Sequence, residues 1–171
     1  MLTAAHCMEG EQDFLDEYHV VVGRHDLEED SKDQRIKMKR MELHPLYDII
    51  NTDNDFSVVQ LAEPIREEEG IGMIKLNSDS AVPEAGAAVS VMGWGVTDPA
   101  EGAFNISDVL METELFALSN EQCEKSNGTL TVDMGTGIEE LDLDMNGQVT
   151  ENMLCAWANE TDSCMGDSGG P

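Results

Sequence analysis

Alternation of apolar and polar residues with a period of two is the dominant pattern along this chain. Arg35-Ile36-Lys37-Met38-Lys39 alternates in this way, which predicts a half-buried β-strand. Tyr18-His19-Val20-Val21-Val22 and Val89-Ser90-Val91-Met92 are β-branched or apolar stretches that also predict strands. Leu110 to Leu118 alternates again, and either a strand or a short helix fits it. The pattern therefore predicts several β-strands along the chain.

Two further elements are predicted from local patterns. Asn54 to Leu61 should form a strand that carries Asp55. Ser119-Asn120-Glu121-Gln122 is a capping-box pattern, in which the first and last side chains satisfy backbone N–H groups at the start of a helix. A short helix should therefore start at Ser119 and carry Cys123.

Charge is the feature of the composition that most restricts function. Acidic residues number 36 against 9 Lys plus Arg, which gives a formal net charge of −27. Nucleic acid is excluded as a partner, because its phosphates would be repelled. The acidic residues form a solvated surface or steer cationic substrates, and the sequence leaves both interpretations open.

The few basic residues are concentrated in one short segment. Five of the nine lie within nine positions: Lys32, Arg35, Lys37, Lys39 and Arg40. They form the exposed side of one strand or a basic exosite for acidic ligands.

No apolar stretch of the sequence is long enough to cross a bilayer, and no signal peptide is visible.

The most specific motif for chemistry is Gly166-Asp167-Ser168-Gly169-Gly170-Pro171. Glycines let the backbone approach a substrate closely, so a serine between them can act as an exposed nucleophile, although an incidental serine on a glycine-rich turn is the plainer alternative. A serine hydroxyl needs an adjacent base, and imidazole can accept a proton near neutral pH. Two further blocks accompany this motif: Leu2-Thr3-Ala4-Ala5-His6-Cys7 near the other end of the chain, and Thr52-Asp53-Asn54-Asp55-Phe56-Ser57-Val58-Val59-Gln60-Leu61 between the two.

These three blocks, in the order histidine, aspartate, serine, resemble the trypsin/chymotrypsin family of serine endopeptidases. The resemblance covers nearly the whole chain, and Gly93-Trp94-Gly95 falls where the family has the same landmark. It implies an all-β fold of two antiparallel six-stranded β-barrels. Residues 1–76 would belong to the first barrel, 77–86 to the connection and 87–171 to the second, with both barrels incomplete at the termini.

The resemblance also implies a role for each site residue. His6 would be the general base, Asp55 the carboxylate that orients it and Ser168 the nucleophile that forms the acyl-enzyme. The backbone N–H groups of Gly166 and Ser168 would form the oxyanion hole. Asp162 would lie in the specificity pocket, where a carboxylate favours Lys or Arg in the substrate.

Asp167 has a different implied role. In the family this aspartate pairs with the amino terminus that zymogen cleavage releases, and the pairing orders the oxyanion turn. We expect such a terminus and several strands to lie outside this chain. Because barrels that lack strands leave unpaired edges, we expect residues 1–171 expressed alone to be inactive and prone to aggregation.

The four cysteines allow three pairings from their number alone. The resemblance pairs Cys123 with Cys155 and implies that the partners of Cys7 and Cys164 lie outside the chain. A disulfide framework implies an oxidising compartment, so the protein is expected to be secreted or vesicular.

The span between Cys123 and Cys155 is longer than the family usually has there. It contains Asp142-Leu143-Asp144-Met145-Asn146-Gly147-Gln148-Val149, which matches the first eight positions of an EF-hand loop, although position twelve is Met153. Asp142, Asp144 and Asn146 are therefore weak candidates to bind calcium, and a plain turn is the alternative. The sequence implies no other metal or cofactor.

Two further features concern the surface. Arg24 stands where calcium-dependent trypsins have a glutamate ligand, which argues against their calcium site. Asn105, Asn127 and Asn159 begin N-glycosylation sequons, so a glycoprotein is expected.

The leading hypothesis is a serine endopeptidase that acts on protein or peptide substrates after Lys or Arg and that protein inhibitors can block. The alternative is a non-catalytic homologue that binds partners through the same fold. Labelling of Ser168 by a fluorophosphonate distinguishes the two, because only an activated serine reacts.

Overall fold

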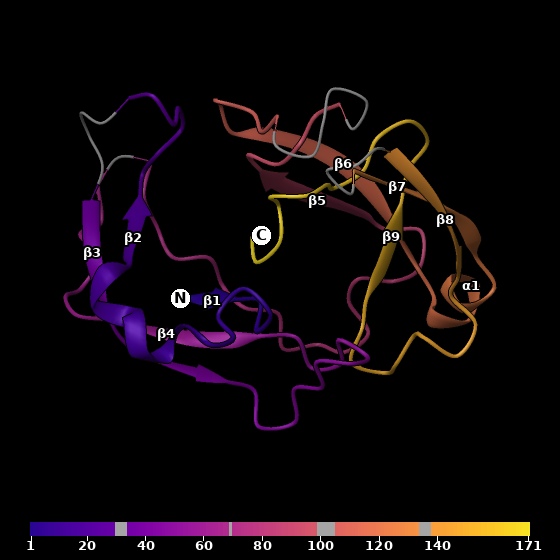
Figure 1. The fold of residues 1–171 in the computed structure, drawn as a ribbon, viewed down its shortest axis with the longest axis horizontal. Helices are drawn as coiled ribbons and strands as arrows, with labels where there is room; N and C mark the ends of the chain where they lie inside the picture. Colours follow the sequence, from indigo (N-terminus) through magenta and orange to yellow (C-terminus); the bar gives the residue numbers. More distant parts are fainter. Residues whose placement is uncertain (30–33, 69, 99–104, 134–137) are drawn as a thin grey trace. The chain divides into compact units, whose positions relative to one another are not determined.

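β-Strands make up most of the regular structure in the described part of this chain, as the sequence predicts. The structure is a computed structural model, and it describes residues 1–29, 34–68, 70–98, 105–133 and 138–171 (Figure 1). Contacts divide the chain into two units, Met1–Ser78 and Asp79–Pro171, and each is described by itself.

The first unit is built on one four-stranded antiparallel sheet. Its strands, in spatial order, are β1 (Leu2–Thr3), β4 (Ser57–Leu61), β3 (Gln34–Leu43) and β2 (His19–Val22). A register shift interrupts the pairing of β3 with β4 between Met38 and Arg40, and such a bulge bends a sheet. Figure 1 shows the result as a curled half-barrel, with β4 turned away from the direction of β2.

Strand β3 confirms the period-two prediction. Gln34 and Ile36 are buried and Met38 is half-buried, whereas the alternating Arg35, Lys37 and Lys39 are exposed. Arg35, Lys37, Lys39 and Arg40 are thus exposed on one strand, which fits the first of the two interpretations of the basic segment; Lys32 lies outside the described residues.

Val59 is at the centre of the core of this unit. It is 1% exposed and packs in one cluster with Met8 and Met41, while the partly buried Leu15, on the 3₁₀-helix η1 (Glu11–Glu17), packs against them. No sequence pattern predicts η1, because this short 3₁₀-helix has no side-chain capping bond.

The strand predicted from Asn54 begins three residues later, at Ser57. Thr52 and Asn54 both have a φ of 54°, in the left-handed region, and a strand cannot continue through such residues. The prediction that Asp55 lies within the strand is therefore wrong: Asp55 lies just before β4.

A turn built on Asp48 precedes these residues. The Asp48 carboxylate accepts hydrogen bonds from the backbone N–H of Ile50 (2.9 Å) and from Asn51 Nδ2 (2.8 Å). Because these bonds favour the ionised form, first the one from Ile50, they lower the pKa of Asp48 below its ordinary value of 3.8. Asp48 and Asp53 are also joined by an antiparallel β-bridge, which holds together the two ends of the segment between them.

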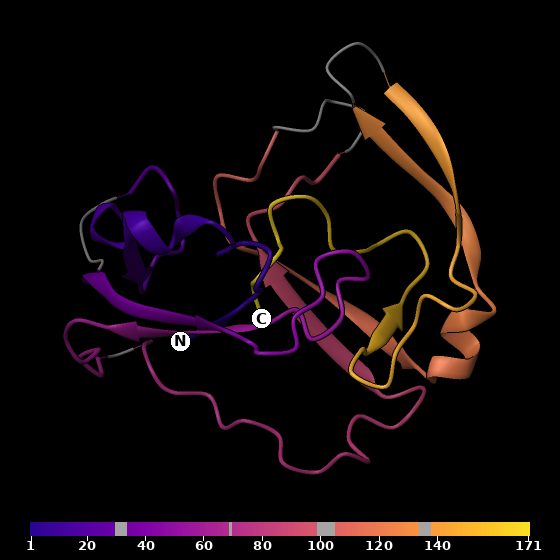
Figure 2. The same cartoon turned by 60° about the horizontal axis from the view of Figure 1, so that its bottom comes forward.

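The second unit contains a three-stranded sheet and a separate hairpin. The sheet consists of β5 (Ala88–Gly93), β6 (Met111–Leu118) and β9 (Cys155–Trp157), all antiparallel. The hairpin pairs β7 (Asn127–Asp133) with β8 (Ile138–Asp144), and Figure 2 shows it rising beyond the end of α1 (Asn120–Glu124).

Local predictions in this unit are confirmed. Leu110 to Leu118 is largely the strand β6, and α1 begins after Ser119, whose hydroxyl accepts a hydrogen bond from the backbone N–H of Gln122. Helix α1 carries Cys123, and the disulfide Cys123–Cys155 is present. This bridge ties α1 to the first residue of β9.

Val59→Ala should destabilise the protein by about 2 kcal/mol, because it removes buried methyl groups and leaves a cavity between Met8 and Met41. Val58→Ala is the matched control, since Val58 directly precedes Val59 in β4 and is 50% exposed. Chemical denaturation of the full-length protein measures both. Equal losses at the two positions would contradict the assignment of the core.

Asp48→Ala should lower the melting temperature at pH 7, and the difference from the parent should shrink at pH 3. Since folding lowers the pKa of Asp48, its stabilising effect is present above the unfolded value of 3.8 and is lost as the pH falls through the lower folded value. Glu63→Ala, a change at an exposed carboxylate outside this turn, is the control. A difference that widens on acidification would show that the turn is not held by the ionised carboxylate.

Candidate active site

His6 and Asp55 meet because β1 and β4 pair. The antiparallel register sets Leu2 opposite Val58 and Thr3 opposite Ser57. The pairing thus brings the segment that follows β1 close to the segment that precedes β4, and His6 contacts Asp55 there although they are 49 positions apart in the sequence. The buried Ser57 hydroxyl also donates to the carbonyl of Ala4 (3.4 Å), which holds the chain just before His6.

The Asp55 carboxylate binds His6 at two points. Oδ1 accepts the backbone N–H of His6 (2.8 Å), and Oδ2 lies 2.6 Å from Nδ1 of the ring. An ionised carboxylate only accepts hydrogen bonds, so the ring must carry a proton on Nδ1. A neutral His6 then keeps the lone pair of Nε2 to accept a proton. The His6 side chain is 43% exposed.

Cys7 and Tyr47 lie near the His6–Asp55 pair. Sγ of Cys7 lies 3.4 Å from His6 Nε2. Burial, and then the negative charge of Asp55, raises the pKa of the Cys7 thiol, so the thiol keeps its proton. The pKa of Tyr47 is also raised, first by loss of solvent and then by the nearby carboxylates of Glu9 and Asp55. The surroundings of His6 are thus anionic, which suits a ring that gains positive charge.

Ser168 stands on a tight turn in the second unit. Its flanking glycines, Gly166 and Gly169, have φ values of 96° and 79°, which residues with a Cβ rarely adopt. The N–H of Asp167 donates to the carbonyl of Cys164 (3.1 Å), and the N–H of Gly170 donates to that of Asp167 (3.0 Å). The predicted glycine-rich turn is therefore present, and Ser168 is exposed on it.

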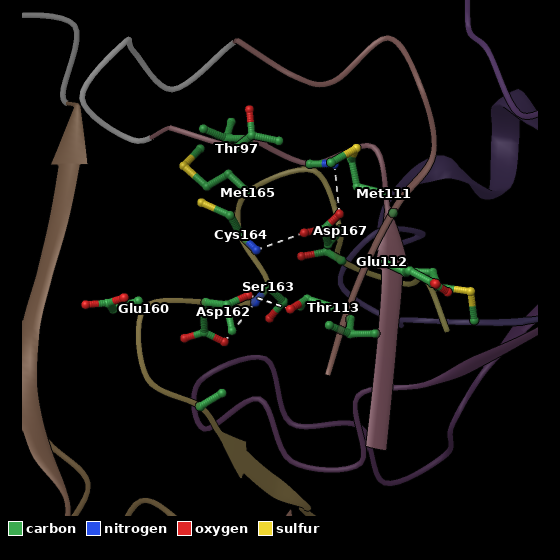
Figure 3. A pocket seen from close by; sticks show the side chains of 18 of the residues that line it. Thr97, Met111, Glu112, Thr113, Glu160, Asp162, Ser163, Cys164, Met165 and Asp167 are labelled. Carbon is green, nitrogen blue, oxygen red and sulfur yellow. Dashed lines mark hydrogen bonds between the residues drawn. The ribbon is translucent and has the colours of Figure 1, made fainter. Parts of the chain in front are cut away.

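A cavity of about 1190 Å³ opens beside this turn (Figure 3). Ser168, Asp167 and the predicted specificity residue Asp162 all line it, together with Glu112 and Glu160. Asp162 Oδ1 accepts the backbone N–H of Ser163 (2.8 Å). The lining carries several carboxylates, and this favours a cationic group over an apolar one.

Thr113 ties the segment before Asp162 to strand β6. Its hydroxyl lies 2.5 Å from the hydroxyl of Thr161, so one of the two donates to the other. Figure 3 shows Thr113 on the β6 side of the cavity, with Asp162 and Ser163 on the neighbouring segment. Strands β6 and β9 already pair with each other, and this bond adds a second link between β6 and the segment that follows β9, at residues that line the cavity.

The residues considered for calcium are spread over a strand and a turn. Asp142 and Asp144 belong to β8, and Asn146 follows it, with its N–H donated to Asp144 Oδ1 (3.0 Å). The insertion between the bridged cysteines is thus mainly a hairpin, which the sequence analysis does not predict. In the described ranges, no group of three His, Cys, Asp or Glu side chains is placed to hold a metal ion. Calcium binding stays an untested expectation.

Three site features are not predicted from sequence. The Thr113–Thr161 bond and the Cys7–His6 contact depend on how distant segments meet, and no local pattern shows this. Gly93 and Gly95 serve only as landmarks in the sequence, although both lie against Asp167. Their conspicuous spacing around Trp94 is the one signal that could have drawn attention to them.

His6 and Asp55 are thus together in the first unit, and Ser168, Gly166, Asp167 and Asp162 are together in the second. Among the described helices, none is long and apolar enough to cross a membrane.

Comparison with known proteins gives one consistent result. A family model described as Trypsin matches residues 1–171. Over the whole chain, the sequence is 33% identical to Trypsin 5G1 of Aedes aegypti, 31% to Brachyurin of Leptuca pugilator and 32% to Atrial natriuretic peptide-converting enzyme of Mus musculus. The chain spans 56%, 65% and 14% of the lengths of these proteins. With the family model matched from the first residue to the last, the chain belongs to the trypsin family.

Proposed function

We propose that the protein is a serine endopeptidase that cleaves peptide bonds after Lys or Arg through an acyl-enzyme. The observation that carries this proposal is the double hydrogen bond from His6 to Asp55, because it leaves Nε2 ready to accept a proton. The relatives named above include a trypsin, which supports the same reaction class.

In the proposed reaction, the Ser168 hydroxyl attacks the carbonyl carbon of the substrate while His6 Nε2 takes its proton. Asp55 stabilises the resulting imidazolium and does not itself become protonated. The N–H groups of Gly166 and Ser168 stabilise the oxyanion. His6 then gives the proton to the leaving amine, and water releases the acyl group by the same steps in reverse order. The reaction requires the two units to meet with Nε2 facing the Ser168 oxygen.

Charge supports the proposed specificity. Residues 79–171 contain half of the 36 acidic residues of the chain but one basic residue, Lys125. Within that unit, Asp162 lines the cavity next to Ser168. A Lys or Arg side chain that enters would pair with a carboxylate, whereas an apolar side chain would leave that charge unpaired.

The same proposal extends to activation and location. Asp167 would pair with a cationic amino terminus after cleavage of a zymogen. The Cys123–Cys155 disulfide supports an oxidising, secreted setting. Protein and peptide chains would be the substrates, and protein protease inhibitors are expected partners.

Asp55→Asn should lower kcat of the activated full-length protein about 10⁴-fold, because an amide can hold the ring in the wrong tautomer. Ser168→Ala should abolish labelling by a fluorophosphonate. Hydrolysis of a Lys or Arg ester and mass spectrometry of the adduct measure the two effects. The control is Asp144→Asn, a carboxylate change on β8. If the parent is not labelled at Ser168, the protein is a non-catalytic homologue.

Asp162→Ser should reduce kcat/KM for Lys and Arg esters about 100-fold, since a substrate cation would enter the cavity without its partner. The same variant should retain activity on an ester of Leu or Phe. Glu151→Gln, an exposed carboxylate change in the same unit, serves as the control. Equal losses on cationic and apolar esters would rule out Asp162 as the specificity residue.

A further inference from the structure

The Asp167 carboxylate is held by the backbone of two different segments. Oδ1 accepts the N–H of Gly95 (2.8 Å), and Oδ2 accepts the N–H of Cys164 (2.9 Å). Figure 3 shows the Asp167 carboxylate turned toward Cys164, with a dashed line marking the hydrogen bond between them. The bond from Gly95 joins the loop that carries Ser168 to the end of β5, and the bond from Cys164 closes the loop on itself.

The space for this carboxylate exists because positions 93 and 95 are glycine. A Cβ added to Gly93 would lie 2.0 Å from Asp167 Oδ1, and one added to Gly95 would lie 2.5 Å from Asp167 Cγ. Neither distance is possible between non-bonded atoms. Neither glycine has a left-handed φ, so space and not backbone conformation explains why these residues lack a side chain.

The same stretch of backbone also holds both ends of the serine-bearing loop. The N–H of Val96 donates to the carbonyl of Met165 (2.8 Å), and the N–H of Met92 donates to that of Pro171 (3.1 Å). Ser168 lies between these two anchors, directly after Asp167. The carboxylate therefore fills the gap between two aligned segments and fixes the part of the loop nearest to the nucleophile.

We propose that Gly93 and Gly95 are positioning residues for Ser168 that act through Asp167; this rests on the proposed function. A side chain at either position displaces the carboxylate and frees the N–H groups of Gly95 and Cys164. The loop that carries Ser168 and the oxyanion donors then loses its fixed geometry. Because the displaced atoms are the end of a side chain, the surrounding strands stay in place.

The test compares Gly93→Ala and Gly95→Ala with Gly128→Ala in the activated full-length protein. Gly128 is the control because it lies in β7 of the same unit, and a Cβ there meets nothing within 4 Å. Gly93→Ala and Gly95→Ala should lower kcat and the rate of fluorophosphonate labelling about 100-fold, as the loss of one oxyanion donor does. KM should change little, and the melting temperature should fall by a few degrees. Gly128→Ala should behave like the parent.

A double-mutant cycle separates this positioning role from a merely structural one. In an Asp167→Ala background the carboxylate is gone, so Gly93→Ala should no longer lower the melting temperature or the residual labelling rate. A full effect in that background, or parental labelling by Gly93→Ala alone, overturns the proposal. If the parent itself is never labelled, the proposed function fails, and the positioning role falls with it. The melting temperatures then still show whether the glycines make room for Asp167.

Discussion

One carboxylate, that of Asp55, determines both the position and the protonation of His6. It binds the backbone N–H and the ring Nδ1 of the same residue, so the ring can neither turn nor change tautomer without breaking a hydrogen bond. The pair exists because two short strands, β1 and β4, align in one register. A slip of that register would separate His6 from Asp55, and the core around Val59 opposes such a slip because it would move buried side chains to the solvent face.

The loop that carries Ser168 depends on glycines, which have no side chain beyond Cα. Gly166 and Gly169 permit the backbone of the turn, while Gly93 and Gly95 leave the volume that the Asp167 carboxylate fills. Hydrogen bonds from two backbone N–H groups then stabilise that carboxylate, and they connect the turn to the end of β5. Asp55 and Asp167 thus both accept hydrogen bonds from backbone N–H groups. The positions of these two carboxylates are therefore fixed by the backbone around them.

The sequence predicts the features that local patterns encode. The alternation in β3, the capping box before α1 and the family of the chain all follow from short motifs, and the structure and the comparisons confirm them. The start of β4 is predicted wrongly because strand propensity alone does not reveal the left-handed residues Thr52 and Asn54. The β7–β8 hairpin is missed because its acidic residues resemble a calcium loop, and the space at Gly93 and Gly95 depends on contacts with residues more than 70 positions away.

The proposed catalysis requires His6 Nε2 to receive the proton of Ser168. The most direct measurement is a crystal structure of the activated full-length protein bound to a peptide inhibitor that ends in Arg. We predict that the Ser168 oxygen lies about 2.6–3.2 Å from His6 Nε2 in that structure, with the arginine beside Asp162. A structure in which the inhibitor is bound while His6 and Ser168 remain far apart would contradict this prediction.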